Sequence, residues 1–236
     1  MKILILWDVD LTLIQIGTLG PELYADAFQR VTGRPMLVQA PPQGRLDPDI
    51  FRDTLEAHGL DVDNYPFPRF AETLATVYSS RSSELHNQGR VLPGAAAALA
   101  ALSETSAVQT VVTGNVKPVA IVKLETFGLG RYIDFEIGAY GSEASVRADL
   151  VRLAQRRASE KHAVTFNASD TVLIGDSAHD VSAGRDSGTH VIAVSSGRDD
   201  ESTLRTAGAH VVLHDLNNTA KLLEAIETCI RTVRTP

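Results

Sequence analysis

Short apolar runs rich in Val, Ile and Leu recur along the chain, and longer stretches with helical patterns separate them. A fully apolar run bounded by turn residues is typical of a strand buried on both faces of a parallel sheet. The runs of this kind are Ile3–Trp7, Ala107–Val112, Thr171–Ile174, His190–Val194 and His210–Leu213. Strands that alternate with helices predict an α/β core with a doubly wound, Rossmann-like parallel sheet.

Helices of this core are predicted from three stretches. Pro93–Ser103 is rich in Ala and begins with Pro, which suits a first helical turn. Asn217–Val233 is expected to close the chain as a helix. The spacing of one helical face is found in Leu150, Leu153, Ala154 and Ala158.

Residues 16–85 interrupt the alternation because they contain no convincing strand. Apolar positions at helical spacing predict three helices instead, separated by segments that contain Pro. We therefore expect an inserted all-helical cap domain at residues 16–85, and a core formed by residues 1–15 and 86–236. The positions that mark the three helices are Tyr24, Phe28 and Val31, then Phe51 and Leu55, then Phe70, Leu74, Val77 and Tyr78.

Composition narrows the class of protein further. The 236 residues are 44% hydrophobic and 22% charged, as in a globular protein with a full core. The net charge is −7 and the basic residues are scattered, which gives no basis for nucleic-acid binding. No apolar run is long enough for a membrane span, and the start of the chain lacks a signal-peptide pattern. We expect a cytoplasmic protein that binds neither nucleic acid nor membranes.

Two acids follow the first predicted strand in the stretch Asp8-Val9-Asp10-Leu11-Thr12. Side chains two positions apart on an extended segment point the same way, so Asp8 and Asp10 should converge. Carboxylates this close repel each other, and a cation between them removes that cost. Oxygen ligands favour magnesium, which binds one or two carboxylates together with substrate phosphate. An acidic turn without a ligand is the alternative for this stretch alone.

Two later strands also end in polar residues. Thr113-Gly114-Asn115 combines a hydroxyl with free backbone N–H groups, which can cradle a phosphate, although a plain strand-to-helix turn looks the same. Farther along, Asp176 follows Gly175, and Asp180 lies one turn later. Asp176 can face a cation while Asp180 supports the surrounding shell. An ordinary helix N-cap is the alternative for Asp176.

Together, these strand ends resemble the motifs of the haloacid dehalogenase-like hydrolase superfamily, over essentially the whole chain. The first motif, Asp-x-Asp-x-Thr, is complete at Asp8–Thr12. The second, a strand that ends in Thr or Ser, matches Thr113, and the fourth, Gly-Asp-x-x-x-Asp, matches residues 175–180. A helical cap between the first two motifs is similar to that of the branch with phosphoglycolate phosphatase and β-phosphoglucomutase.

The resemblance implies a role for each residue. Asp8 would attack phosphorus and form an aspartyl-phosphate, while Asp10 would protonate the leaving group and then activate water. Thr113 and Arg147 would steady the phosphate oxygens. Substrate contacts are expected from Thr12, Gly114 and Asn115. Magnesium would be held by Asp8, Asp10 (through its backbone carbonyl), Asp176 and Asp180.

The third family motif usually supplies a Lys, and this sequence departs from that pattern. Arg147 occupies the matching place, where it keeps the positive charge but differs in reach and shape. Lys117 and Lys123 are alternatives for the role because both lie beyond the second motif. A solvated helix face is the expected position of both lysines.

The pattern predicts a magnesium-dependent phosphatase that acts on a small phosphorylated metabolite. A β-phosphoglucomutase-like phosphomutase would use the same aspartyl-phosphate and is the first alternative. A non-catalytic binding protein on the same scaffold is the second, and the complete set of acids argues against it. The cap is expected to select the substrate, and its Arg45 could reach a carboxylate or a second phosphate, unless it is an ordinary surface Arg.

Overall fold

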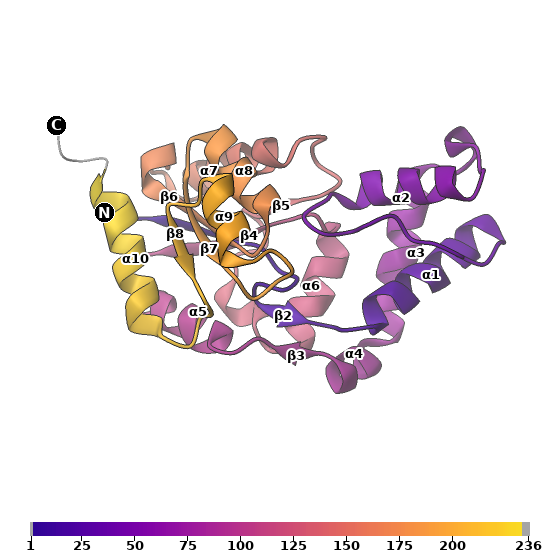
Figure 1. Ribbon diagram of the computed structural model, residues 1–236, viewed down its shortest axis with the longest axis horizontal. Helices are drawn as coiled ribbons and strands as arrows, with labels where there is room; N and C mark the ends of the chain where they lie inside the picture. The colour runs from indigo at the N-terminus through magenta and orange to yellow at the C-terminus, as the bar shows by residue number, and fades with distance from the viewer. Residues whose placement is uncertain (1, 233–236) are drawn as a thin grey trace.

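A six-stranded sheet forms the centre of the larger part of the molecule (Figure 1). Its order is β5-β4-β1-β6-β7-β8, and every neighbouring pair is parallel. The computed structural model describes residues 2–232. Its strands in this sheet are β1 Leu4–Trp7, β4 Val108–Thr113, β5 Ala139–Tyr140, β6 Thr171–Gly175, β7 His190–Val194 and β8 Val211–Leu213. The predicted parallel sheet is confirmed, and only the two-residue β5 was missed, because it is too short to give an apolar run.

Successive residues of β1 pack on opposite faces of the sheet, which explains why its sequence is apolar throughout. Ile5 and Trp7 belong to a cluster that includes α5, α6 and α10, whereas Leu4 and Leu6 belong to one that includes α7 and α8. Helices on both faces confirm the doubly wound core. The helices of this part are α5 Ala95–Ser103, α6 Lys117–Thr126, α7 Arg147–His162, α8 Ala178–Ser187, α9 Glu201–Ala207 and α10 Thr219–Thr232.

The two core helices whose ends were predicted agree with the structure to within two residues at the ends that it describes. The predicted last residue of the C-terminal helix, Val233, lies outside the described residues. None of the helices in residues 2–232 is long and apolar enough to cross a membrane. Three short 3₁₀ helices complete the described chain: η1 Val62–Asn64, η2 Gly130–Tyr132 and η3 Ala168–Asp170.

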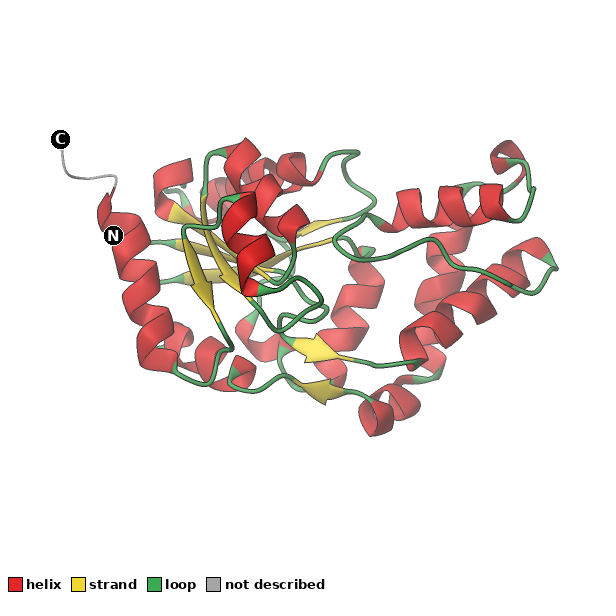
Figure 2. Cartoon of the chain, viewed as in Figure 1, coloured by secondary structure: helices red, strands yellow, loops and turns green. Residues whose placement is uncertain are grey.

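A separate group of helices extends from the sheet (Figure 2). Aromatic residues fill its interior: the rings of Phe51 and Phe70 stack with centroids 4.0 Å apart, and Tyr24 lies 4.9 Å from Phe70. Every position that predicted the three cap helices is buried. The helices are α1 Leu19–Thr32, α2 Asp47–Ala57, α3 Phe67–Ser80 and α4 Ser82–Gln88, of which α4 was not predicted.

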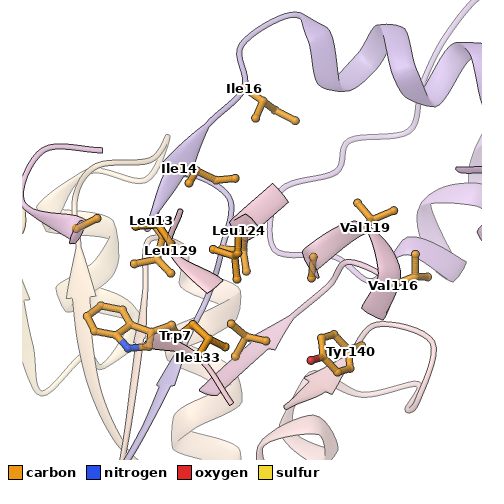
Figure 3. Packing of buried hydrophobic residues seen from close by; sticks show 14 of the residues in the cluster. Trp7, Leu13, Ile14, Ile16, Val116, Val119, Leu124, Leu129, Ile133 and Tyr140 are labelled. Carbon is orange, nitrogen blue, oxygen red and sulfur yellow. The ribbon is translucent and has the colours of Figure 1, made fainter. Parts of the chain in front are cut away.

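The chain leaves the sheet region and returns to it through a small antiparallel pair of strands, β2 (Ile14–Gln15) and β3 (Arg90–Val91). Leu13, Ile14 and Ile16 continue the hydrophobic cluster from Trp7 along this connection (Figure 3). One continuous core therefore links the sheet to the helical cap. The predicted domain boundary after residue 85 lies within α4, and the division into two domains stays a prediction.

Candidate active site

The three polar strand ends meet at one edge of the sheet. They do so because β4, β1 and β6 are neighbours in register: Trp7 pairs with Val111 on one side and with Ile174 on the other. Beyond these strands lies a cavity of about 590 Å³ between the sheet and the cap, a volume that suits a small-molecule ligand. Its lining includes Asp8, Asp10, Thr113, Gly114, Asn115, Arg147 and Asp176 from the core, and Tyr24, Arg45, Asp47 and Tyr78 from the cap.

An arginine lies among the buried acids. One terminal nitrogen of Arg147, Nη2, lies 2.6 Å from Asp8 Oδ1 and 2.5 Å from Asp180 Oδ1. Arg147 is the first residue of α7, so the helix start places the guanidinium directly over the end of β1. The position assigned to Arg147 by the resemblance thus contacts the proposed nucleophile. Its Nε is buried and has no hydrogen-bond partner in the described part of the chain.

Asp180 is held from two directions. Its Oδ2 accepts hydrogen bonds from the backbone N–H and the hydroxyl of Ser177, at 3.1 and 2.6 Å, while Oδ1 meets Arg147. Ser177 is the N-cap of α8 and forms a capping box with Asp180. The N-cap alternative for Asp176 is therefore wrong, because the residue after it does the capping and leaves the Asp176 carboxylate free to face the cavity.

The turn after β1 depends on an unusual backbone conformation at Leu11, whose φ is +64°. Left-handed conformations of this kind cost a non-glycine residue about 1 kcal/mol, and neighbouring bonds offset that cost. The Leu11 N–H donates to Ile14 O at 2.7 Å, and the Ser196 hydroxyl donates to Leu11 O at 2.6 Å. The turn directs the buried Thr12 hydroxyl to Asp176 Oδ1 at 3.1 Å, where it contacts an acid rather than open space for substrate.

The ionisation of the acids favours a cation at this place. Burial and the charge of Asp180 raise the pKa of Asp8 to about 7, against the opposing effect of Arg147. Burial and the charges of Asp8 and Asp180 raise the pKa of Asp176 to about 9. The ionised forms are therefore costly unless a positive ion neutralises them.

The donor set also fits such an ion. One carboxylate oxygen from each of Asp8, Asp176 and Asp180 lies within 4.8 Å of the others. A Cβ at Gly197 would lie 1.8 Å from Asp176 Oδ2, so only glycine leaves room for this carboxylate. Oxygen donors of this kind suit magnesium, and Asp8 and Asp176 would hold it. The Asp10 carboxylate is not part of this cluster.

Asp10 belongs to a second polar group. Lys123 Nζ donates to both of its carboxylate oxygens, at 2.8 and 2.6 Å, and to Asn115 Oδ1 at 2.8 Å. The Asn115 amide donates in turn to Asp10 Oδ2 at 2.7 Å and to Thr113 Oγ1 at 2.8 Å. Thr113 and Asn115, both predicted to contact substrate, are thus joined to Asp10 through side chains.

The expected solvated position of Lys123 is wrong: the residue is only 3% exposed and pairs with Asp10. Burial disfavours its ammonium, but Asp10 and Tyr78 more than compensate and raise the pKa of Lys123 above its usual value. The sequence contains a signal for this position, because Lys123 lies in the apolar stripe of α6 with Val119, Ala120 and Leu124. Lys117 lies at the surface as expected, where it pairs with Glu136 at 3.2 Å.

The cap loop before α2 contacts the core mainly through its backbone. The N–H of Asp47 donates to Gly114 O at 2.9 Å, and its carboxylate accepts from the N–H of Val116 at 2.9 Å. A Cβ at Gly114 would lie 2.0 Å from Arg45 O, so the two loops touch. The side chain of Arg45 lines the cavity but pairs with Asp53 of α2. The buried Asp47 was not predicted as a site residue.

The chain also matches a known family. The sequence model of the haloacid dehalogenase-like hydrolase family matches residues 5–185, from β1 into α8. This span contains all three strand ends described above. A search of the curated proteins gives no match.

Solved structures with this fold cover nearly the whole chain. A β-phosphoglucomutase from Clostridium difficile has a TM-score of 0.69 at 14% identity, and the match covers 98% of this chain and 100% of that one. A predicted phosphoglycolate phosphatase from Haemophilus somnus has a TM-score of 0.64 at 19% identity, with 93% and 97% covered. A predicted phosphatase from Clostridium acetobutylicum has a TM-score of 0.65 at 19% identity, with 94% and 98% covered. At such identities the likeness concerns the fold.

Proposed function

Because the chain belongs to the haloacid dehalogenase-like hydrolase family, we propose that it is a magnesium-dependent phosphatase of the cytoplasm that hydrolyses a small phosphomonoester. The observation that carries this proposal is the different setting of the two acids after β1. Asp8 is buried beside Arg147, whereas the Asp10 side chain is 38% exposed towards the cavity and pairs with Lys123. Two carboxylates in separate environments can perform separate chemical tasks.

Asp8 is the proposed nucleophile. Arg147 occupies its Oδ1, while the one hydrogen bond to Oδ2 from the described residues is a long one of 3.4 Å from the Thr12 hydroxyl. Oδ2 is therefore the freer oxygen to attack phosphorus and form the aspartyl-phosphate. Arg147, Thr113 and the backbone at Gly114 line the same cavity and can supply donors to the phosphate oxygens.

Magnesium, held by Asp8 and Asp176, would supply positive charge that offsets the repulsion between these acids and the phosphate. Asp180 keeps Arg147 in place from the second side and supports the metal-binding loop through Ser177. Asp10 lines the same cavity, and its proposed task is to pass a proton to the leaving oxygen and later to take one from water.

The cavity favours a phosphatase over a phosphomutase. A mutase of sugar phosphates must bind a second phosphate on the cap side, which requires a free cation there. Arg45 is the only cap cation in the described lining, and it is already paired with Asp53. The similar fold of a β-phosphoglucomutase keeps the mutase as the alternative to be tested.

The test is phosphate release from a panel of small phosphomonoesters, with magnesium or with a chelator, by wild type and Asp8→Asn. We expect magnesium-dependent release that falls at least about 10³-fold in the variant. Release that persists in Asp8→Asn would refute the nucleophile. Interconversion of sugar-phosphate isomers without accumulation of free phosphate would establish the mutase instead.

A further inference from the structure

The buried ammonium of Lys123 pairs with Asp10, the proposed acid–base residue. Lys123 is 3% exposed, and its Nζ contacts Asp10 Oδ1, Asp10 Oδ2 and Asn115 Oδ1 within 2.8 Å. From the cap, the ring of Tyr78 on α3 covers the same ammonium, with its centroid 5.4 Å away. Lys123 therefore contacts Asp10, Asn115 in the loop after β4, and Tyr78 of the cap helix α3.

The two carboxylate oxygens of Asp10 accept hydrogen bonds from different sets of donors. Oδ2 accepts from Lys123 at 2.6 Å and from the Asn115 amide at 2.7 Å. Within residues 2–232, Oδ1 accepts only from Lys123, at 2.8 Å. A carboxylate offers about four lone-pair positions, two on each oxygen. Oδ1 thus keeps a free position, and the two donors fix its direction in the cavity.

We propose that Lys123 is a positioning residue, which together with Asn115 orients Asp10 so that Oδ1 is the atom that exchanges protons with leaving group and water. This inference rests on the proposed phosphatase function. In the first step, Asp8 bonds to phosphorus, the bond from phosphorus to the leaving oxygen breaks, and that oxygen takes the proton of Asp10. In the second step, water attacks phosphorus, Asp10 takes its proton, and the bond from Asp8 to phosphorus breaks.

A purely structural role does not explain this arrangement. An apolar side chain at position 123 would complete the stripe formed by Val119, Ala120 and Leu124. Replacement of buried charged pairs by packed apolar side chains is often neutral or stabilising. The Lys123–Asp10 pair thus adds little to the stability of the fold that an apolar residue at position 123 would not provide. What it does provide is a fixed orientation of the Asp10 carboxylate.

The test is Lys123→Met, which keeps an unbranched side chain but removes the ammonium. It is measured with p-nitrophenyl phosphate and with an alkyl phosphate that the wild type hydrolyses. Nitrophenolate leaves without a proton, so the first step does not need a correctly oriented Asp10. The attack of water in the second step does need it, because Asp10 takes the proton of that water. We expect a nitrophenol burst within about threefold of the wild-type rate, then turnover slower by about 10- to 100-fold. The alkyl phosphate should show no burst and at least the same loss.

Lys117→Met is the matched control, because it removes a surface ammonium from the same helix and should change neither phase. Lys123→Arg keeps the charge with a different shape, and should lose less turnover than Lys123→Met with the burst retained. If Lys123→Met does not fold, Lys123→Arg provides the test: a retained burst with slower turnover supports the role of Lys123, and equal losses in both phases contradict it.

Equal losses in burst and turnover, or no loss in either, would overturn the role of Lys123. A wild type that releases no phosphate from any substrate would overturn the proposed function itself. An active wild type with uniform losses in the variants overturns only the inference about Lys123.

Discussion

Replacing Asp8 with Asn is expected to stabilise the metal-free protein at neutral to alkaline pH, although it should abolish activity. Asp8 is 7% exposed and faces two other acids, so its ionised form is disfavoured in the folded state. Asparagine has nearly the same shape and carries no charge. The substitution therefore removes the repulsion while Arg147 keeps its bond to Asp180.

The size of the effect follows from the pKa of Asp8, which rises from 3.8 to about 7 on folding. At 1.36 kcal/mol per pKa unit, the ionised side chain costs the folded state about 4 kcal/mol. The shift already includes the attraction of Arg147, so the loss of that charged pair needs no separate subtraction, and we expect a gain of about 4 kcal/mol. Such a gain raises the melting temperature of a protein of this size by about 5–15 °C.

The sign of the pH dependence is fixed by the direction of the shift. A carboxyl whose pKa is raised on folding binds more protons in the folded than in the unfolded state, so stability falls as the pH rises. For Asp8 the loss begins near pH 4 and is complete above about pH 7. Wild type and Asp8→Asn should therefore have similar stability at pH 4 and differ fully at pH 8.5.

The assay is urea unfolding of both proteins in chelator at these two pH values, with Asp26→Asn as a control. Asp26 pairs with Arg30 on the outside of α1 and should give no gain that depends on pH. Saturating magnesium should shrink the difference or reverse it, because the ion stabilises the wild-type carboxylates. An Asp8→Asn protein that is no more stable than wild type at pH 8.5 in chelator would refute this reasoning.

Two further predictions concern the contacts around this cluster. Arg147→Met should lower the free energy of unfolding at pH 8 by about 3 kcal/mol in urea titrations, because it leaves the buried carboxylates of Asp8 and Asp180 without their cation. Arg147→Lys keeps the charge and should lower the free energy of unfolding by less. Gly114→Ala should lower kcat/KM at least tenfold while unfolding changes by under about 2 kcal/mol, because its Cβ would meet Arg45 O at 2.0 Å and displace the cap loop. An unchanged kcat/KM would show that this loop contact does not matter for turnover.

The sheet could be predicted from the sequence because a strand buried on both faces has a simple pattern. Ile3–Trp7 and His190–Val194 are apolar at every position, and turn residues mark their ends. Strand order could not be derived from the pattern, since pairing of β1 with β4 and β6 depends on contacts between distant segments. The helix α4 was missed for a related reason: it buries only Leu85, so its sequence has no apolar stripe.

The charged site residues that belong to a motif were predicted from the sequence, whereas Lys123, a charge within a helix and outside the motifs, was not. Asp8 and Asp176 stand out because each is a charged residue directly after a buried strand. A solvated position was expected for Lys123 because lysines on helices are usually exposed, although Val119 and Ala120, one turn before it, are apolar and buried. A lysine inside an apolar stripe needs a polar partner, and in this fold Asp10 pairs with it.

The cap loop shows a different limit, because most of its contacts with the core are made by backbone atoms, which every residue has. The sequence directed attention to the charge of Arg45, yet the contacts with the loop after β4 come from the carbonyl of Arg45 and from Asp47. They are possible because Gly114 has no side chain, and Gly141 also packs closely against it: a Cβ at Gly141 would lie 1.9 Å from Gly114 O. Three backbone segments are therefore stacked beside Thr113. The cap is fixed relative to the predicted phosphate site by this stack, so a substituent at either glycine should change substrate selection before it changes the fold.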